Sequence, residues 1–205
     1  MNYYFWVLFF LILSTNAWAQ NRTRGVDFRM QLVSGTLDFT SISDVQRKFN
    51  GLGSELSTHD YLYEKGRWRS TGFISSRVMS FVGQEVQEGE TDDLQIFTIA
   101  PGLEFGYGPF YIQAAYQMMN VNAYYISSAS LGKRFTLNGM SYSAGMNFRF
   151  GHLGLGLGAA QVNLPVSPEK MGITNASVYK ELSYSFNLIY YIGVPPRKFF
   201  SELFR

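Results

Sequence analysis

The chain lacks cysteine, has only two histidines and carries no block of basic residues. The absence of cysteine excludes disulfides, thiolate catalysis, thiolate-ligated metals and a lipidated cysteine anchor. A net charge of +2 without a Lys- or Arg-rich segment argues against nucleic acid as a partner. Beyond the first twenty residues, no apolar run approaches the ~18 residues of a membrane helix. If the chain crosses a membrane, it has to cross as strands.

The chain is instead rich in aromatic residues, at 17%, and has 20 glycines in 205 residues, a length that suits one domain of eight strands. Residues 3–13 form an apolar run, and Ala17 and Ala19 supply the small-x-small pattern that a signal peptidase reads. We therefore expect a signal peptide at 1–19. No Lys or Arg precedes the apolar run, so a retained membrane anchor is the alternative.

The clearest pattern lies in residues 93–117, DLQIFTIAPGLEFGYGPFYIQAAYQ. On either side of the turn-forming residues 106–109, apolar side chains such as Phe97, Leu103 and Ile112 alternate with small or polar ones. A period of two is that of a β-strand. Each arm has about 10 to 13 residues, the length that crosses a bilayer at a tilt. The stretch therefore predicts a transmembrane β-hairpin.

The same alternation predicts six further strands, at 25–37, 51–63, 68–82, 136–150, 153–160 and 182–192. In the strand at 51–63 the leucines and tyrosines take opposite parities, which a β-bulge reconciles. Polar segments predict loops at 40–50, 84–93, 124–134 and 163–179, whereas short turns are predicted at 64–67, 106–109 and 151–152. Long and short connections thus alternate, as they do in an all-β, eight-stranded antiparallel up-and-down transmembrane β-barrel.

Arginine decides which face of each strand points inward. Arg69 and Arg77 share the odd positions of the strand at 68–82, and an arginine facing lipid near the bilayer midplane costs about 2–4 kcal/mol. The odd positions are therefore predicted to face the lumen, where we expect Arg77 to pair with Glu104. The predicted lumen polar network is Asp27, Arg29, Glu55, Arg69, Arg77, Glu104, Gln113, Gln117, Asn147 and Arg149.

Such a lumen is just wide enough to be filled by side chains, so a plug of paired charges is predicted. A narrow polar conduit, or a small-ligand cavity beside the glycine-rich strand at 153–160, is the alternative. Aromatic residues gather near the short turns and predict a girdle at the lipid interface: Tyr63, Trp68, Phe105, Phe110, Phe148, Phe150 and Tyr190. In a soluble lipocalin-like barrel, the other possibility, the apolar face points inward and Arg77 and Glu104 lie outside.

With this alternation, this turn pattern and an aromatic-rich last strand containing Tyr184, Phe186 and Tyr190, the chain resembles the small eight-stranded outer-membrane barrels of Gram-negative bacteria, the OmpA-transmembrane, OmpX and OmpW-like superfamily. The resemblance covers 25–193 and is architectural, so it is specific for fold and compartment rather than for function. It implies insertion by the outer-membrane assembly machinery, contact with outer-membrane lipid and lipopolysaccharide, and periplasmic termini. We expect a barrel at 20–194 and a periplasmic tail at 195–205.

The predicted function is a non-enzymatic outer-membrane barrel with a structural or surface-interaction role. A narrow, porin-like channel for small or hydrophobic solutes and a lipid A deacylase or acyltransferase are the alternatives. The barrel enzymes of that kind use a His and a Ser near the outer rim, whereas His152 falls in a periplasmic turn and His59 in mid-strand. Two separated histidines, and an acidic segment at 84–93 without calcium-loop spacing, predict no metal and no cofactor. A closed barrel has no free edges, so we expect a monomer.

Overall fold

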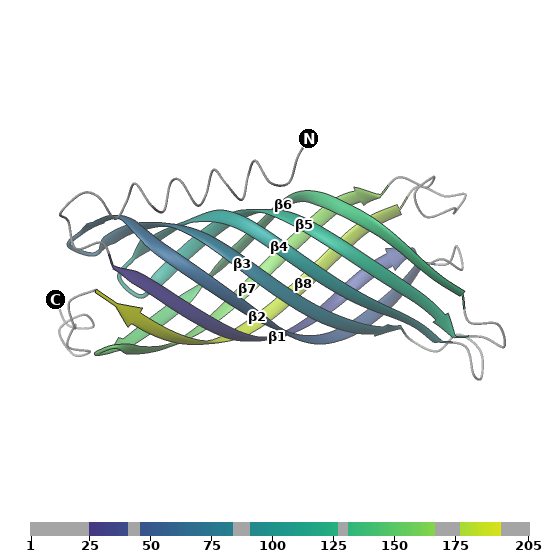
Figure 1. Ribbon diagram of the computed structural model, residues 1–205, viewed down its shortest axis with the longest axis horizontal. Helices are drawn as coiled ribbons and strands as arrows, with labels where there is room; N and C mark the ends of the chain where they lie inside the picture. Colours follow the sequence, from purple (N-terminus) through teal and green to yellow (C-terminus); the bar gives the residue numbers. More distant parts are fainter. Residues whose placement is uncertain (1–24, 41–45, 84–90, 127–130, 167–176, 194–205) are drawn as a thin grey trace.

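The chain folds into a closed barrel of eight antiparallel strands (Figure 1). The computed structural model describes residues 25–40, 46–83, 91–126, 131–166 and 177–193. The strands are β1 (Val26–Thr40), β2 (Gln46–Lys65), β3 (Trp68–Gly83), β4 (Thr91–Tyr107), β5 (Phe110–Ile126), β6 (Leu131–Phe150), β7 (Leu153–Val166) and β8 (Ser177–Ile192). Each strand pairs with the next, and β1 pairs with β8 to close the sheet. The predicted fold class is confirmed.

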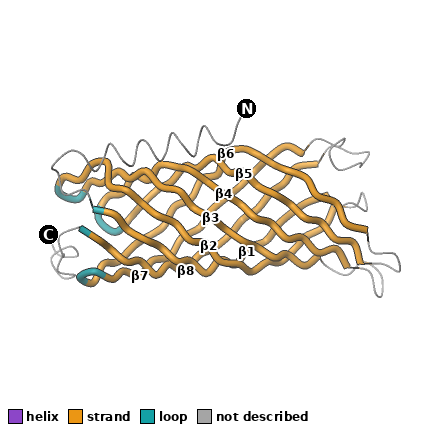
Figure 2. The backbone as a smooth tube through the Cα atoms, in the orientation of Figure 1, coloured by secondary structure: helices purple, strands orange, loops and turns teal. Residues whose placement is uncertain are grey.

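Three short turns join β2 to β3, β4 to β5 and β6 to β7 at one end of the barrel, which we call the turn end (Figure 2). Gly66, Gly108 and Gly151 have φ values of 62°, 58° and 66° in these turns, a left-handed conformation that favours glycine. The pairing of Val26 with Ile192 brings the first and last strand residues to the same end. The opposite end, where β1, β3, β5 and β7 end, is the loop end. The segments 1–24 and 194–205, with the expected signal peptide and tail, lie outside the described residues.

The strands are longer than the alternation predicts, so each of the four predicted loops is too long at one or both ends. β2 already begins at Gln46, β5 continues to Ile126, and β8 begins at Ser177. Asp92 and Asp93 of the acidic segment belong to β4, whereas Glu85, Glu88 and Glu90 lie outside the described residues. The predicted bulge in β2 is present as a register shift between Tyr61 and Tyr63.

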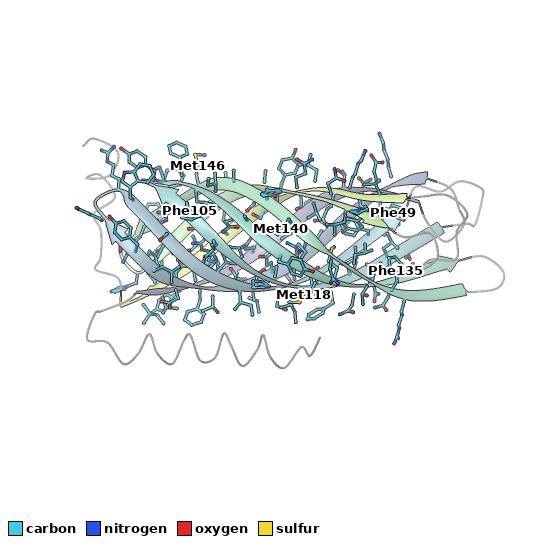
Figure 3. The ribbon with its side chains drawn as sticks, turned by 90° about the horizontal axis from the view of Figure 1, so that it is seen from above. Phe49, Phe105, Met118, Phe135, Met140 and Met146 are labelled. Carbon is cyan, nitrogen blue, oxygen red and sulfur yellow. The ribbon has the colours of Figure 1, made fainter. Side chains whose placement is uncertain are left out.

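The outer surface of the turn-end half is an apolar band. On β4 it runs from Phe97 to Tyr107 and on β6 from Met140 to Phe150, about 11 residues each, enough to span the ~25 Å apolar band of an outer-membrane barrel at its usual tilt. Figure 3 shows Phe105 and Met146 at this end. Among the described residues, no helix is long and apolar enough to cross a membrane.

Toward the loop end the polarity of both faces inverts. The outward side chains there are mostly polar: Ser34, Thr36, Asp38, Lys48, Asn50, Ser80, Gln95, Asn120, Asn122, Arg134, Thr136, Asn138, Gln161, Asn163 and Lys180. The outward exceptions include Leu52, Val82, Val178 and Leu182. We call this outer surface of the loop-end half the collar. The polarity of the collar explains why the predicted strands are shorter than the observed ones. In the sequence, polar residues at the ends of strands resemble loops.

The inside of the collar is packed with apolar side chains, which we call the apolar core: Val33, Leu37, Phe49, Met79, Phe81, Leu94, Ile96, Met119, Val121, Ala123, Phe135, Leu137, Val162, Leu164 and Tyr179. Phe49 and Phe135 mark its place at the loop end in Figure 3. Phe49 and Met79 are 0% exposed and Phe81 is 1% exposed, so water does not reach them. The barrel therefore combines a lipid-facing half with a polar interior and a polar-surfaced half with an apolar interior.

Candidate functional site: the barrel lumen

The lumen of the turn-end half contains a buried ion network, which we call the charged layer. Its centre is Arg29, which donates from Nε and Nη2 to Asp27 at 2.8 and 3.2 Å and from Nη1 and Nη2 to Glu104 at 2.6 and 3.0 Å. Gln113 Nε2 donates to Glu104 at 2.8 Å, and the Tyr61 hydroxyl donates to Asp27 at 3.1 Å. Arg29 is 2% exposed and both carboxylates are 0% exposed. Water therefore does not reach the centre of this layer.

Two further arginines lie between the charged layer and the rim of the turn end. Arg69 donates from Nη1 to the Gly108 carbonyl at 2.9 Å, and its Nε lies 3.5 Å from Glu104 Oε1. Arg149 donates from Nε to the Gly151 carbonyl at 2.8 Å, and its guanidinium carbon lies 4.3 Å from the centroid of the Tyr191 ring. A cation over an aromatic face is stabilised electrostatically. Both arginines thus tie turn backbone to the lumen wall.

A second ion group lies deeper, toward the apolar core. Arg77 donates from Nη1 and Nη2 to Glu181 at 2.6 and 3.0 Å, and the Tyr179 hydroxyl donates to the same carboxylate. Glu55 lies directly opposite Arg77 in the β2–β3 register. Across both groups, the inward side chains that the structure describes include four arginines and four carboxylates, so the lumen is balanced in formal charge.

The expected ion pair between Arg77 and Glu104 is wrong. Both side chains face the lumen, but the β3–β4 register puts Arg77 opposite Thr98 and Glu104 opposite Thr71. Thr71 and Arg77 are six residues apart on β3, about 20 Å at ~3.3 Å per residue. Arg77 pairs instead with Glu181 of β8, and Glu104 pairs with Arg29 of β1.

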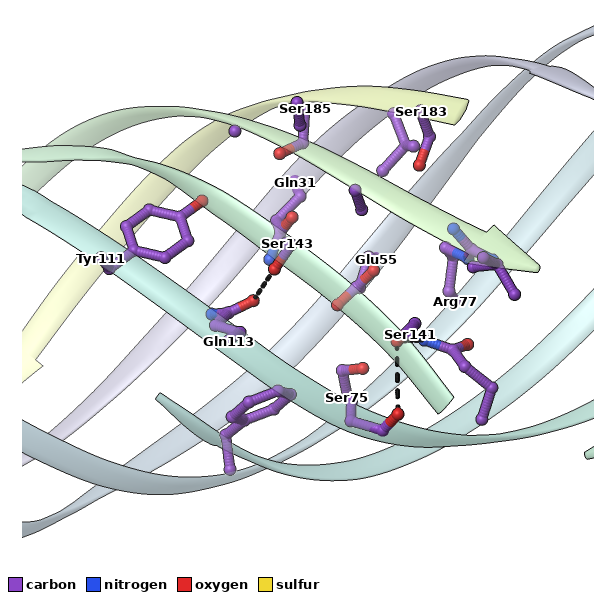
Figure 4. A pocket seen from close by; sticks show the side chains of 18 residues that line it. Gln31, Glu55, Ser75, Arg77, Tyr111, Gln113, Ser141, Ser143, Ser183 and Ser185 are labelled. Atoms are coloured by element: carbon purple, nitrogen blue, oxygen red, sulfur yellow. Dashed lines mark hydrogen bonds between the residues drawn. The ribbon is translucent and has the colours of Figure 1, made fainter. Parts of the chain in front are cut away.

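Between the charged layer and the apolar core lies a cavity of about 50 Å³ (Figure 4). It is lined largely by hydrogen-bonding side chains, among them Glu55, Ser75 and Gln117. Ser143 donates to Gln113 Oε1 at 2.6 Å at its edge. A cavity of this size holds about three to five water molecules at ~10–15 Å³ each. It is too small for the solutes that a porin-like conduit carries.

The glycines of β7 make room for side chains that cross the lumen. A Cβ on Gly158 would collide with the Tyr111 hydroxyl, and a Cβ on Gly156 would collide with the Asn147 amide. Gly158 lines the central cavity. The small-ligand space considered beside this strand is therefore occupied in large part by Tyr111 and Asn147.

His59 is buried in the charged layer rather than placed at a rim. Its Nε2 lies 3.0 Å from Ser57 Oγ, and its Nδ1 lies 3.5 Å from Thr71 Oγ1 and 3.7 Å from Glu104 Oε2. Its ring stacks on Phe73 at a centroid distance of 4.8 Å. The chain of contacts from Ser57 through His59 to Glu104 resembles that of a hydrolytic triad. However, Ser57 is 5% exposed and His59 is 0% exposed. Neither is among the described residues that line the cavity.

All ten residues of the predicted polar network point into the barrel, but they do not form one network: most belong to two ion groups or to the cavity wall, and Asn147 belongs to neither. Glu181 is absent from the predicted network, although it has the parity of Ser183, because the predicted last strand begins only at Leu182. The apolar core is absent from the prediction as well. Within the described ranges, no three His, Asp or Glu side chains form a group that could hold a metal ion.

The aromatic residues predicted at the interface all lie on the outer surface near the turn end, where Trp68 and Tyr107 are in ring contact at 4.8 Å. A second set lies on the outer surface close to the collar: Tyr116, Tyr142 and Tyr184, exposed by 46%, 62% and 58%. Tyrosines with an apolar ring and a polar tip favour the boundary between hydrocarbon and water. The apolar band is therefore bordered by aromatic residues on both sides.

No protein-family model and no curated protein sequence matches the chain. Solved structures are similar to it. Ail, the attachment invasion locus protein of Yersinia pestis, solved with the heparin analogue sucrose octasulfate, has a TM-score of 0.53 at 11% identity, over 82% of this chain and 99% of Ail. Neisserial surface protein A has a TM-score of 0.51 at 11% identity, over 80% and 96% of the two chains. The resemblance to small eight-stranded outer-membrane barrels is confirmed at the level of the fold.

Proposed function

We propose that this chain is a non-enzymatic outer-membrane barrel that presents its loop end at the cell surface and keeps its lumen closed to solutes. The observation that carries the proposal is the double seal of the lumen. At the turn end, Arg29 and Glu104 exclude water with a compact ion network. At the loop end, Phe49 and Phe81 exclude it with packed apolar side chains. A barrel with a sealed lumen cannot carry solutes, so we propose that it acts through its surface.

The orientation follows from the asymmetry of the two ends. Outer-membrane barrels have short periplasmic turns and longer outer connections, and here the three short turns lie at the same end as Val26 and Ile192. The turn end and both termini are therefore assigned to the periplasm. The collar then projects beyond the outer boundary of the hydrocarbon. All eight strands are paired, which supports a monomer, and we propose that the outer-membrane assembly machinery inserts it.

We propose lipopolysaccharide as the lipid partner of the collar. β5, β6 and β7 carry neighbouring amides on the outer surface, with Asn120 opposite Thr136 and Asn122 opposite Arg134. Gln161 and Tyr142 form the adjacent pair across β6 and β7. Amide and hydroxyl groups hydrogen-bond to sugar hydroxyls, and an arginine binds phosphate with matched geometry. The collar is thus suited to the phosphorylated sugar layer of the outer leaflet.

A lipid-modifying enzyme is the competing function, and the contacts of His59 with Ser57 and Glu104 are the observation in its favour. A catalytic serine has to touch its substrate, and Ser57 is sealed in the charged layer without a place on the cavity wall. We therefore assign these residues to the structure of the lumen. Mass spectrometry of lipid A from cells with and without the gene distinguishes the two functions, because an altered acyl pattern requires an enzyme.

The double seal predicts that the folded protein forms no channel. In planar bilayers, we expect insertion without reproducible unitary conductance, because neither the charged layer nor the apolar core leaves a water-filled path. Heat-modifiable gel migration of the same sample is the control that it is folded. Unitary steps of constant size from a heat-modifiable sample would overturn the closed lumen.

The orientation predicts which positions reagents reach from outside the cell. Because the chain has no cysteine, a single substitution supplies the only thiol. We expect N138C, on the collar, to react with a membrane-impermeant maleimide on intact cells. The matched variant R67C, in the exposed β2–β3 turn, is expected to react only after the outer membrane is permeabilised. The reverse pattern would show that the turn end faces outward.

A further inference from the structure

We infer that the central cavity is a binding site for one monovalent metal cation, with the Glu55 carboxylate as its charged ligand. The inference is independent of the surface role proposed above, since it concerns only the interior of the barrel. Glu55 lines the cavity and lies opposite Arg77. The two terminal nitrogens of Arg77 are already bound to Glu181 at 2.6 and 3.0 Å. The three groups together carry one net negative charge next to the cavity.

The cavity also presents an oxygen atom that lacks a donor. Gln117 is 9% exposed and lines the cavity, and its Nε2 donates to Ser141 Oγ at 2.7 Å. Its Oε1 is buried and has no hydrogen-bond partner among the described residues. A buried carbonyl oxygen without a partner is costly, and a cation in the cavity would supply its missing contact.

The remaining polar groups of the wall suit the same ligand. Ser75, Ser141, Ser183 and Ser185 contribute hydroxyl oxygens to the wall, several of them visible around Glu55 in Figure 4. Oxygen donors of the carboxylate, carbonyl and hydroxyl kinds select hard cations rather than soft ones. Nitrogen and sulfur ligands play no part in this site.

Charge and size restrict the ligand to a small monovalent ion such as sodium, potassium or rubidium. The one net negative charge of Glu55, Glu181 and Arg77 balances one positive charge, and no group of three acidic or histidine side chains occurs in the described part of the chain. The volume of about 50 Å³ admits such an ion with a few waters but not an organic cation such as choline. The charged layer and the apolar core close the cavity on both sides, so the ion is enclosed as the barrel folds.

The test compares cations that differ in size at equal ionic strength. Full-length protein is refolded from urea into detergent micelles in sodium, rubidium or choline chloride, and its Tm is measured by tryptophan fluorescence. We expect a higher Tm in sodium and rubidium than in choline, by about 3–6 °C for each tenfold excess of cation over Kd. E55Q keeps the side-chain shape and removes the charge, so we expect its Tm to be the same in all three salts. D38N, which removes a carboxylate from the collar, is expected to keep the dependence on the cation.

A second measurement does not depend on the folding of a variant. Crystals of the unmodified protein refolded in rubidium chloride are expected to show an anomalous peak in the cavity, within coordination distance of Glu55 and Gln117 Oε1. Waters alone in the cavity, with no anomalous peak, would overturn the site. Equal Tm values of the unmodified protein in the three salts would also overturn it. Neither result would change the conclusions on conductance or orientation, so the surface role is tested independently of the cation site.

Discussion

Replacement of Glu104 by alanine is expected to lower the free energy of unfolding by about 3–5 kcal/mol, the range for breaking a buried ion pair by removing one partner. Arg29 would keep its bonds to Asp27 but lose both bonds to Glu104. Arg69, whose Nε lies 3.5 Å from the same carboxylate, would lose this ion pair. The charged layer would then hold an unbalanced guanidinium where water does not reach. Urea unfolding in phospholipid vesicles, followed by tryptophan fluorescence, measures the loss.

Two further variants separate this effect from the loss of a side chain in general. R29M combined with E104A removes both charges of the pair, so we expect a smaller loss than the sum of the two single losses. Side chains in direct contact commonly show coupling of about 0.5–3 kcal/mol. D38A, on the collar between Lys48 and Lys180, is expected to cost at most about 1 kcal/mol, as exposed ion pairs do. Additive losses for R29M and E104A would contradict the role of the charged layer.

The sequence predicts three features of the fold: the number of strands, the closed barrel and the inward direction of the polar residues. Each of them depends on residues that are close together in the chain. A period of two assigns a side chain to a face without knowledge of its neighbours. The cost of an arginine in hydrocarbon then decides which face is inside, and Arg77 alone is enough to set the register of β3. The bulge of β2 also has a local signature, because its leucines and tyrosines take opposite parities in the sequence; in the structure, Leu62 and Tyr63 are both exposed on the outer surface.

The partners of the inward charges did not follow, because they depend on distances across the lumen. Arg77 and Glu181 are 104 residues apart in sequence, and Arg29 and Glu104 are 75 apart. The alternation of one strand fixes the direction of a side chain but not its height in the barrel relative to other strands. Those heights require the register of every pair around the sheet. The predicted pair of Arg77 and Glu104 assumes that the two residues lie at the same height because their strands are adjacent. In the structure they lie at different heights along the barrel axis.

The apolar core was missed for a different reason. The prediction from the sequence assumes that polar side chains point inward and apolar ones outward along the whole of each strand. This assumption holds only where the outer surface meets lipid. Beyond the hydrocarbon the solvent changes and the pattern reverses, as in a soluble barrel. In β5 the reversal is visible in the sequence, since the outward positions change from Tyr116 and Met118 to Asn120 and Asn122. The point of inversion in each strand is thus a local marker of the membrane boundary.

A pair of arginine substitutions tests this boundary with a large expected difference. Leu103 is central in the outward apolar stretch of β4 and 48% exposed. We expect L103R to lower the free energy of unfolding in phospholipid vesicles by about 2–4 kcal/mol, the cost of arginine near the midplane. The matched variant N120R lies on the collar, where the side chain meets water and headgroups. Its cost is expected to stay within about 0.5 kcal/mol, as for other exposed surface substitutions.

The comparison is informative because the two positions look alike in a barrel without a membrane. Both are outward residues of neighbouring strands, Leu103 in β4 and Asn120 in β5, and both lie on paired backbone. In a barrel surrounded by water, arginine would be tolerated at each position. Vesicles of thinner lipid should reduce the cost at Leu103, since its distance to the headgroups becomes shorter, and leave Asn120 unchanged. Equal costs at the two positions would contradict the assignment of the apolar band to hydrocarbon and of the collar to the aqueous side.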